Sequence, residues 1–127
     1  MSEEPVRDVI EGEGYAVGHL DSLGDGYGFR KIRRPLGVTA FGVNAIVQPP
    51  GYAPPRHSHE EQEELYFVHR GRVRIEFGDG SSHVLDEGGL ARVDASTVRC
   101  VHSLDADAVY VIVGGKDGYV GRDGRPG

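Results

Sequence analysis

Glycine and proline divide this chain into short apolar runs, and that division limits the possible fold more than any other feature. The sequence holds 20 glycines and 7 prolines. No window repeats apolar residues with the 3.6-residue period of an amphipathic helix, whereas several runs alternate apolar and polar side chains. In one run Val73, Ile75 and Phe77 alternate with charged residues, as in a strand with one buried face. Many short strands separated by turns predict a sandwich or barrel.

The expected strands can be placed approximately along the chain. Two positions favour a break: Pro35 to Gly37, and Gly71 between two apolar runs. The Asp79–Gly80 pair supplies the positive φ that a tight hairpin needs. We expect no helix and about ten strands, at residues 15–20, 28–34, 37–47, 56–60, 64–70, 72–78, 82–89, 90–94, 98–104 and 108–115.

The length of 127 residues fits a single domain over residues 1–127, with its core at about 29–114. A folded chain of this length buries about two-thirds of the surface that it exposes when unfolded. The head up to Gly12 and the tail over 116–127 are polar and rich in glycine. Both are therefore expected to be loosely ordered.

Net charge, apolar run length and cysteine content limit the partners and the location that we expect for this chain. The formal net charge of −6 argues against a nucleic-acid partner. No run approaches the ~20 apolar residues that span a bilayer, so no membrane partner is expected, and the acidic start is not a signal peptide. Cys100 is the single cysteine, which rules out a disulfide within the chain and favours a cytoplasmic location.

His57 and His59 are the first candidates for a metal site. A spacing of two puts both imidazoles on one face of a strand, and the prolines just before them favour an extended backbone. Glu64 follows at the start of the next expected strand. Two imidazoles and one carboxylate suit Fe(II) and can also hold Mn, Ni or Zn. The alternative is that the glutamates at 60, 61, 63 and 64 form a solvated turn without a metal.

The spacing of Gly51, His57, His59, Glu64 and Gly71 resembles the first sequence motif of the cupin superfamily. The resemblance extends over about residues 29–114. It implies an all-β double-stranded β-helix (jelly-roll) barrel, in which His57, His59 and Glu64 would be three of the metal ligands. The chain is most similar to a group of small single-domain bacterial cupins, which defines a fold and a pocket rather than a reaction.

The second cupin motif is only partly kept. Gly88 fits its first position, but Arg99 stands where the family has its fourth ligand, a histidine. Arginine keeps its proton and has no lone pair for a cation, so it cannot be a ligand. A bidentate pair between Arg99 and Glu64 would fill the metal position with a fixed positive charge. Three further family positions differ here, at Asp94, Ser96 and Ser103.

Three interpretations of Arg99 remain open. It clamps an anion above a three-ligand metal, replaces the metal in a metal-free pocket, or bridges strands as a structural residue. The second leads to the function that the sequence favours: a module that binds a small polar or anionic ligand, with Arg99 as anchor and Tyr66 and Gln62 in the pocket.

The alternative function is a metal-dependent oxygenase or isomerase that uses His57, His59 and Glu64. The cofactor is accordingly either absent or one divalent metal (Fe, Mn, Ni or Zn). A structural or accessory role is the third hypothesis. We expect a homodimer in each case, because closed two-fold dimers are the commonest oligomers.

Overall fold

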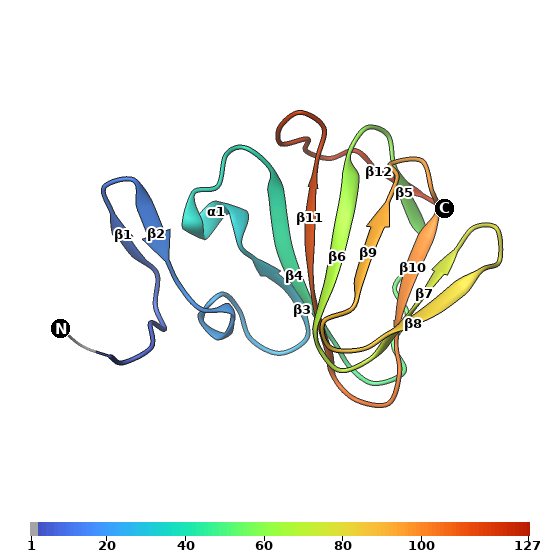
Figure 1. The fold of residues 1–127 in the computed structure, drawn as a ribbon, viewed down its shortest axis with the longest axis horizontal. Helices are drawn as coiled ribbons and strands as arrows, with labels where there is room; N and C mark the ends of the chain where they lie inside the picture. Colours follow the sequence, from blue (N-terminus) through green and yellow to red (C-terminus); the bar gives the residue numbers. More distant parts are fainter. Residues whose placement is uncertain (1–2) are drawn as a thin grey trace.

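The computed structural model describes residues 3–127, and its main body is a pair of five-stranded antiparallel sheets that face each other (Figure 1). One sheet has the strand order β12 (Gly124–Pro126), β5 (His57–His59), β10 (Arg99–Ser103), β7 (Val73–Phe77) and β8 (Ser82–Leu85). The other has the order β3 (Gly28–Lys31), β4 (Gly42–Gln48), β11 (Ala108–Gly115), β6 (Glu63–Arg70) and β9 (Leu90–Val93). The predicted all-β class is confirmed.

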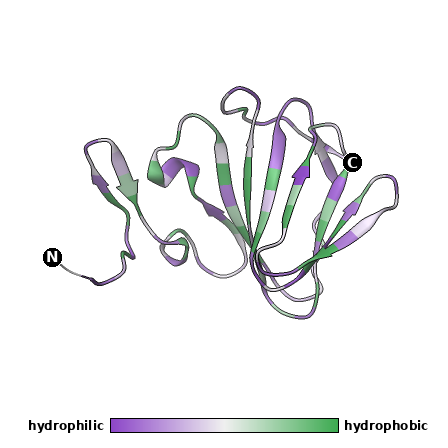
Figure 2. Ribbon diagram, viewed as in Figure 1, coloured by the Kyte–Doolittle hydropathy of each residue, from purple (hydrophilic) through white to green (hydrophobic). Residues whose placement is uncertain are grey.

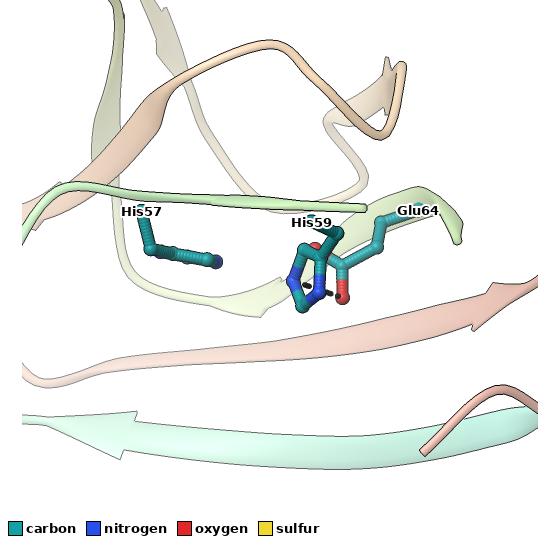
Figure 3. A group of neighbouring side chains, drawn as sticks. All are labelled: His57, His59 and Glu64. Atoms are coloured by element: carbon teal, nitrogen blue, oxygen red, sulfur yellow. Dashed lines mark ion pairs between the residues drawn. The ribbon is translucent and has the colours of Figure 1, made fainter. Parts of the chain in front are cut away.

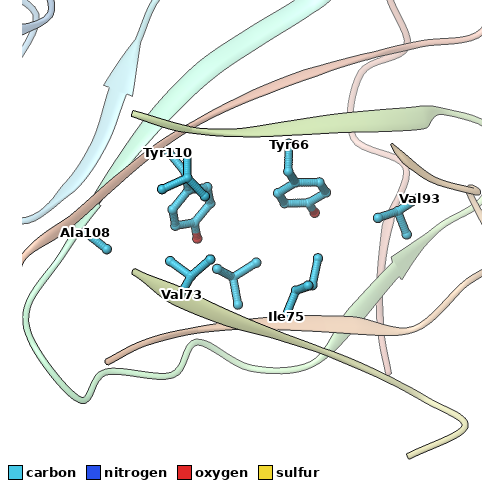
Figure 4. Packing of buried hydrophobic residues seen from close by; sticks show 8 residues of the cluster. Tyr66, Val73, Ile75, Val93, Ala108 and Tyr110 are labelled. Atoms are coloured by element: carbon cyan, nitrogen blue, oxygen red, sulfur yellow. The ribbon is translucent and has the colours of Figure 1, made fainter. Parts of the chain in front are cut away.

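At one end, the space between the sheets is filled by alternate side chains of the strands, as the period-two pattern predicted. Figure 2 shows hydrophobic and hydrophilic residues alternating along several barrel strands. In Figure 4, Tyr66 and Tyr110 from one sheet lie over Val73 and Ile75 from the other. Burial of this cluster is the main stabilising contribution at this end of the interior, which we call the packed end.

The inward side chains become polar toward the opposite end of the same strands. Along β6, buried positions run from Val68 through Tyr66 to Glu64, and along β10 they run from Val101 to Arg99. We call the region around Glu64 and Arg99 the polar end. The turn between β5 and β6 lies beside it, so the fold brings β5 to this end.

The first half of the chain differs from the sequence-based prediction. The strand expected at residues 28–34 ends at Lys31, and Arg33–Leu36 form one turn of helix, α1. Gly37 closes this turn in the left-handed conformation, with φ 72°. The next strand consequently begins at Gly42 rather than at residue 37. A short 3₁₀ turn, η1 (Leu20–Ser22), precedes β3.

Both ends of the chain are more regular than the expected loose order. At the N-terminal end β1 (Ile10–Gly12) and β2 (Tyr15–Val17) form a hairpin that extends away from the barrel and pairs with no other strand among residues 3–127 (Figure 1). At the C-terminal end β12 pairs with β5, with Gly124 opposite His59. Within residues 3–127, no helix has the length and apolar character needed to cross a membrane.

Candidate metal and ligand site

His57, His59 and Glu64 lie together at the polar end (Figure 3). One ligand atom from each lies within 4.8 Å of the other two. β5 is extended as predicted, so both imidazoles project from one face, with their ring centroids 5.2 Å apart. Glu64, near the start of β6, reaches the same point from the facing sheet. The sequence prediction that these three residues converge is therefore confirmed.

The two oxygens of Glu64 have different neighbours. Oε1 accepts hydrogen bonds from the Tyr66 hydroxyl at 2.7 Å and from Nη2 of Arg99 at 2.9 Å. Oε2 lies 3.4 Å from Nε2 of His59, the pair joined by the dashed line in Figure 3. The carboxylate therefore presents one oxygen to Arg99 and Tyr66 and the other to His59.

Arg99 is fully buried, with 0% of its surface exposed, and three of its five hydrogen bonds go to backbone carbonyls. Nη1 donates to the carbonyls of Asp94, Ala95 and Thr97, at 3.3, 3.1 and 2.6 Å. Nε donates to the Tyr66 hydroxyl at 3.3 Å. Only Nη2 reaches Glu64, so the bidentate pair expected from the sequence is wrong. The turn that carries these three carbonyls holds the guanidinium behind Glu64.

A cavity of about 810 Å³ opens beside the side chains of His57, His59 and Glu64, with walls from both sheets. Tyr66 and Gln62, both predicted to bind a ligand, line it, as do His57 and His59. Arg99 is not among the described residues that line it, so the geometry gives no support to direct contact between its guanidinium and a ligand. Apolar wall residues include Ile46, Val101, Ile112 and Val120.

Asp123 is a site residue that sequence reasoning missed. It is buried, and its Oδ1 lies 2.8 Å from Nδ1 of His59. The same carboxylate accepts hydrogen bonds from the backbone N–H groups of Glu61 and Gln62 and from the Gln62 side chain. The surrounding glycines and charged residues gave no periodic signal, and this segment had been expected to be loosely ordered.

The surroundings shift the pKa values of several groups at the site, and those of His57 and Asp123 bear on cation binding. Burial, followed by the positive charge of Arg99, lowers the pKa of His57, so its imidazole is neutral at pH 7 with a lone pair available. Burial alone would raise the pKa of Asp123, but the N–H groups of Gln62 and Glu61 and the contact with His59 hold that pKa well below its usual range. Asp123 is therefore a fixed negative charge beside His59.

The donor set fits a divalent cation. Two imidazole nitrogens and one carboxylate oxygen are the ligand types shared by Fe, Mn, Ni and Zn sites. Oε2 of Glu64 faces His59 rather than Arg99. Arg99 cannot supply a fourth ligand, which leaves coordination positions for water or a substrate.

The sequence profile of the Cupin domain family matches residues 45–114, more than half of the chain. The chain therefore belongs to the cupin domain family, and its two facing sheets form the double-stranded β-helix of that family. No curated protein matches the sequence.

Solved structures agree with this fold. A cupin protein from Bacteroides fragilis is 25% identical, with a TM-score of 0.65 over 74% of this chain and 79% of that one. A sugar phosphate isomerase of the cupin superfamily from Silicibacter pomeroyi is 26% identical, with a TM-score of 0.65 over 91% of this chain and 68% of that one.

Two DMSP lyase chains, the second from Ruegeria pomeroyi, are also similar in fold. They are 23% and 16% identical, each with a TM-score of 0.61 over 68% of this chain. The matched regions span only 44% and 43% of those chains, less than half of their length. At this identity the similarity shows the fold alone.

Proposed function

We propose that this cupin binds a small anionic or polar molecule in its cavity, beside one divalent cation held by His57, His59 and Glu64. The observation that carries the proposal is the division of the Glu64 carboxylate. Arg99 and Tyr66 bond to Oε1, while Oε2 lies 3.4 Å from Nε2 of His59, and one ligand atom of each of the three residues lies within 4.8 Å of the other two. Arg99 is therefore compatible with a cation in the pocket, in contrast to the metal-free pocket that the sequence favoured.

In this proposal Arg99 orients Glu64 and does not itself contact the cation. Carboxylates that ligate metals are themselves commonly held by hydrogen bonds from a second layer of residues. Nη2 of Arg99 and the Tyr66 hydroxyl hold Oε1 and so orient Oε2. The three backbone carbonyls that accept from Nη1 keep the guanidinium in place.

The buried charges support an anionic ligand only when a cation is present. Arg99 contributes one positive charge, and Glu64 and Asp123 contribute one negative charge each, so the site alone carries one net negative charge. A divalent cation reverses this to one net positive charge. Because low-dielectric walls focus the field of a charge into a cleft, that charge would attract a carboxylate or phosphate group.

The bound metal would supply Lewis acidity to the ligand. The solved sugar phosphate isomerase, 26% identical over 91% of this chain, supports isomerisation of a small phosphorylated or carboxylated sugar as the first reaction to assay. Tyr66 and Gln62 line the cavity next to the histidines and are the proposed polar contacts for the substrate. An oxygenase reaction on the same metal ligands is the second reaction class to assay.

Elemental analysis of untagged protein, purified without a chelator, tests the proposal. We expect close to one Fe, Mn, Ni or Zn per chain, and loss of that metal in the double variant His57→Ala/His59→Ala. His83→Ala is the matched control, because His83 is an exposed histidine of β8. Wild-type protein that contains no metal and binds none of the four ions on titration would refute the proposal.

A metal-free binding pocket is the second candidate, and one contact favours it. Oε2 of Glu64 lies 3.4 Å from Nε2 of His59, so a protonated His59 could satisfy this oxygen in place of a metal. In that case wild type would lack metal, while Arg99→His would gain one by restoring a fourth ligand.

Association into a homodimer is part of the proposal. The outer face of the second sheet exposes Leu65 and Phe67 of β6 and Leu90 of β9, and Phe67 pairs with both Leu90 and Val111. Covering such a surface is favourable because apolar area is removed from water. Sedimentation equilibrium of wild type and of Phe67→Glu tests it: dimeric wild type and a monomeric variant are expected.

A further inference from the structure

We propose that Asp123 is a positioning residue that keeps the proton of His59 on Nδ1 and so turns the lone pair of Nε2 toward Glu64. Asp123 lies outside the region matched by the family profile, which ends at residue 114. The inference deepens the proposed function and rests on it, because Nε2 is the atom of His59 that faces the other ligands.

The first argument is the distribution of hydrogen bonds around the Asp123 carboxylate. Oδ2 accepts from the backbone N–H groups of Glu61 and Gln62, both at 2.9 Å. Oδ1 lies 2.7 Å from Nε2 of Gln62 and 2.8 Å from Nδ1 of His59. A carboxylate offers about four acceptor positions and no proton, so these four nitrogens fill it when each of them donates.

The second argument concerns the choice between the two neutral forms of His59. With the proton on Nε2, the lone pair of Nδ1 would face Oδ1 of Asp123 at 2.8 Å, and two acceptors would repel each other. With the proton on Nδ1, the same contact becomes a charge-assisted hydrogen bond. The lone pair of Nε2 then faces Oε2 of Glu64 at 3.4 Å, so this repulsion is weaker than the one at 2.8 Å that it replaces. Nε2 of Gln62 lies 2.9 Å from Nδ1 but 2.7 Å from Oδ1 of Asp123, the closer and charged acceptor.

The third argument is that the segment carrying Asp123 is attached to the barrel on both sides of this residue. Before it, Tyr119 and Val120 line the cavity, and the Tyr119 ring stacks on Arg33 at 3.8 Å. After it, β12 pairs with β5, the strand that carries His59. Asp123 is thus held in register with the histidine that it contacts, which is the usual arrangement for a residue that orients a metal-binding imidazole.

The experiment is the tautomeric state of His59 in chelator-treated protein, read from long-range ¹H–¹⁵N correlations of its ring at about pH 8, above the ordinary pKa of imidazole. Wild type is expected to carry the proton on Nδ1. In Asp123→Asn the N–H groups of Glu61 and Gln62 hold the amide oxygen, so the NH₂ group faces His59 and the proton moves to Nε2. Arg125→Ala, which removes the exposed β12 ion pair with Glu60, is the control and should resemble wild type.

Zn²⁺ titration of the same proteins gives the second readout. Asp123→Asn should bind Zn²⁺ about 10–100-fold more weakly than wild type, and Arg125→Ala should bind it equally. A wild-type ring protonated on Nε2, or on both nitrogens, would overturn the inference even if Asp123→Asn did not fold, and so would an unchanged tautomer in that variant. If the tautomers behave as expected but wild type binds no Zn²⁺, the inference stands and the proposed function fails.

Discussion

The packed end and the polar end of the barrel interior are built by the same strands, a few residues apart. On β10, Val101 belongs to the first and Arg99 to the second, and on β6 the same holds for Val68 and Glu64. At the packed end each side chain stabilises the fold through the apolar area that it buries. Replacing one of them with a smaller side chain leaves a cavity but no unpaired polar group. At the polar end each buried charge depends on a named partner, such as Oε1 of Glu64 for Nη2 of Arg99.

Because of this difference, we expect substitutions at the packed end to change mainly stability and substitutions at the polar end to change binding as well. Burial of apolar surface is non-directional, so the packed end tolerates small changes of shape. Hydrogen bonds and ion pairs in a buried site are directional, and an unpaired member is costly. The polar end is consequently rigid at the atoms that would bind a cation, and substitutions there should have larger and more specific effects.

The largest effect is expected for Arg99→Leu. This change leaves the buried carboxylate of Glu64 without its cationic partner, and such a loss costs about 3–5 kcal/mol of unfolding free energy. Urea denaturation followed by circular dichroism measures it. Arg92→Leu is the matched control: Arg92 pairs with Glu63 and Asp94 on the surface, and its loss should change stability little. Equal effects of the two substitutions would contradict the distinction between the two ends.

His57→Ala should affect binding more than stability. It removes one of the three proposed ligands. Loss of a residue that only hydrogen-bonds a metal ligand lowers metal affinity by up to about 100-fold, so loss of a ligand itself should lower Zn²⁺ affinity by at least that factor. Because His57 is only half-buried, the loss in stability should be smaller than for Arg99→Leu. Calorimetric titration and urea denaturation of one preparation give both values. Unchanged affinity would remove His57 from the ligand set.

Ile75→Val tests the packed end by itself. Ile75 is buried in the apolar cluster, and deletion of one methyl group there costs about 0.5–1.5 kcal/mol. Zn²⁺ affinity should stay at the wild-type value, since no ligand or second-layer residue changes. A loss of Zn²⁺-binding free energy larger than the loss of unfolding free energy would show that the two ends are coupled.

The smallest effect is expected in the wall of the cavity. Tyr119→Leu removes the contact between the Tyr119 ring and the Arg33 guanidinium, worth about 0.5–1 kcal/mol at an exposed site. Arg33→Leu should cost a similar amount, and the double variant should cost less than the two together. Additive losses would mean that the stacked pair does not stabilise this wall.

The strands and the convergence of the three proposed metal ligands could be predicted because their signals are local. The alternation around Val73 and Ile75 is visible within five residues, and the structure places β7 at Val73–Phe77. The spacing of His57, His59 and Glu64 needs only that one strand is extended and the next follows a turn. In each case the residues that carry the signal are close in the chain.

The features that could not be predicted depend on a few residues or on distant contacts. Helix α1 is four residues long, too short to show a helical period, and it ends because Gly37 adopts a positive φ. The direction of the Arg99 guanidinium depends on the carbonyls of a turn, which residue types do not specify. Asp123 meets His59 across 64 residues, from a segment without a hydrophobic pattern.

The pairing of β12 with β5 has a consequence for the order of assembly during translation. The ribosome makes the chain from its N-terminus, so His57, His59 and Glu64 are synthesised well before Asp123. A nascent chain without β12 already carries all three proposed ligands but lacks Asp123, the residue proposed to fix the His59 tautomer. On this proposal the site would reach its cation-binding form only after β12 has paired with β5.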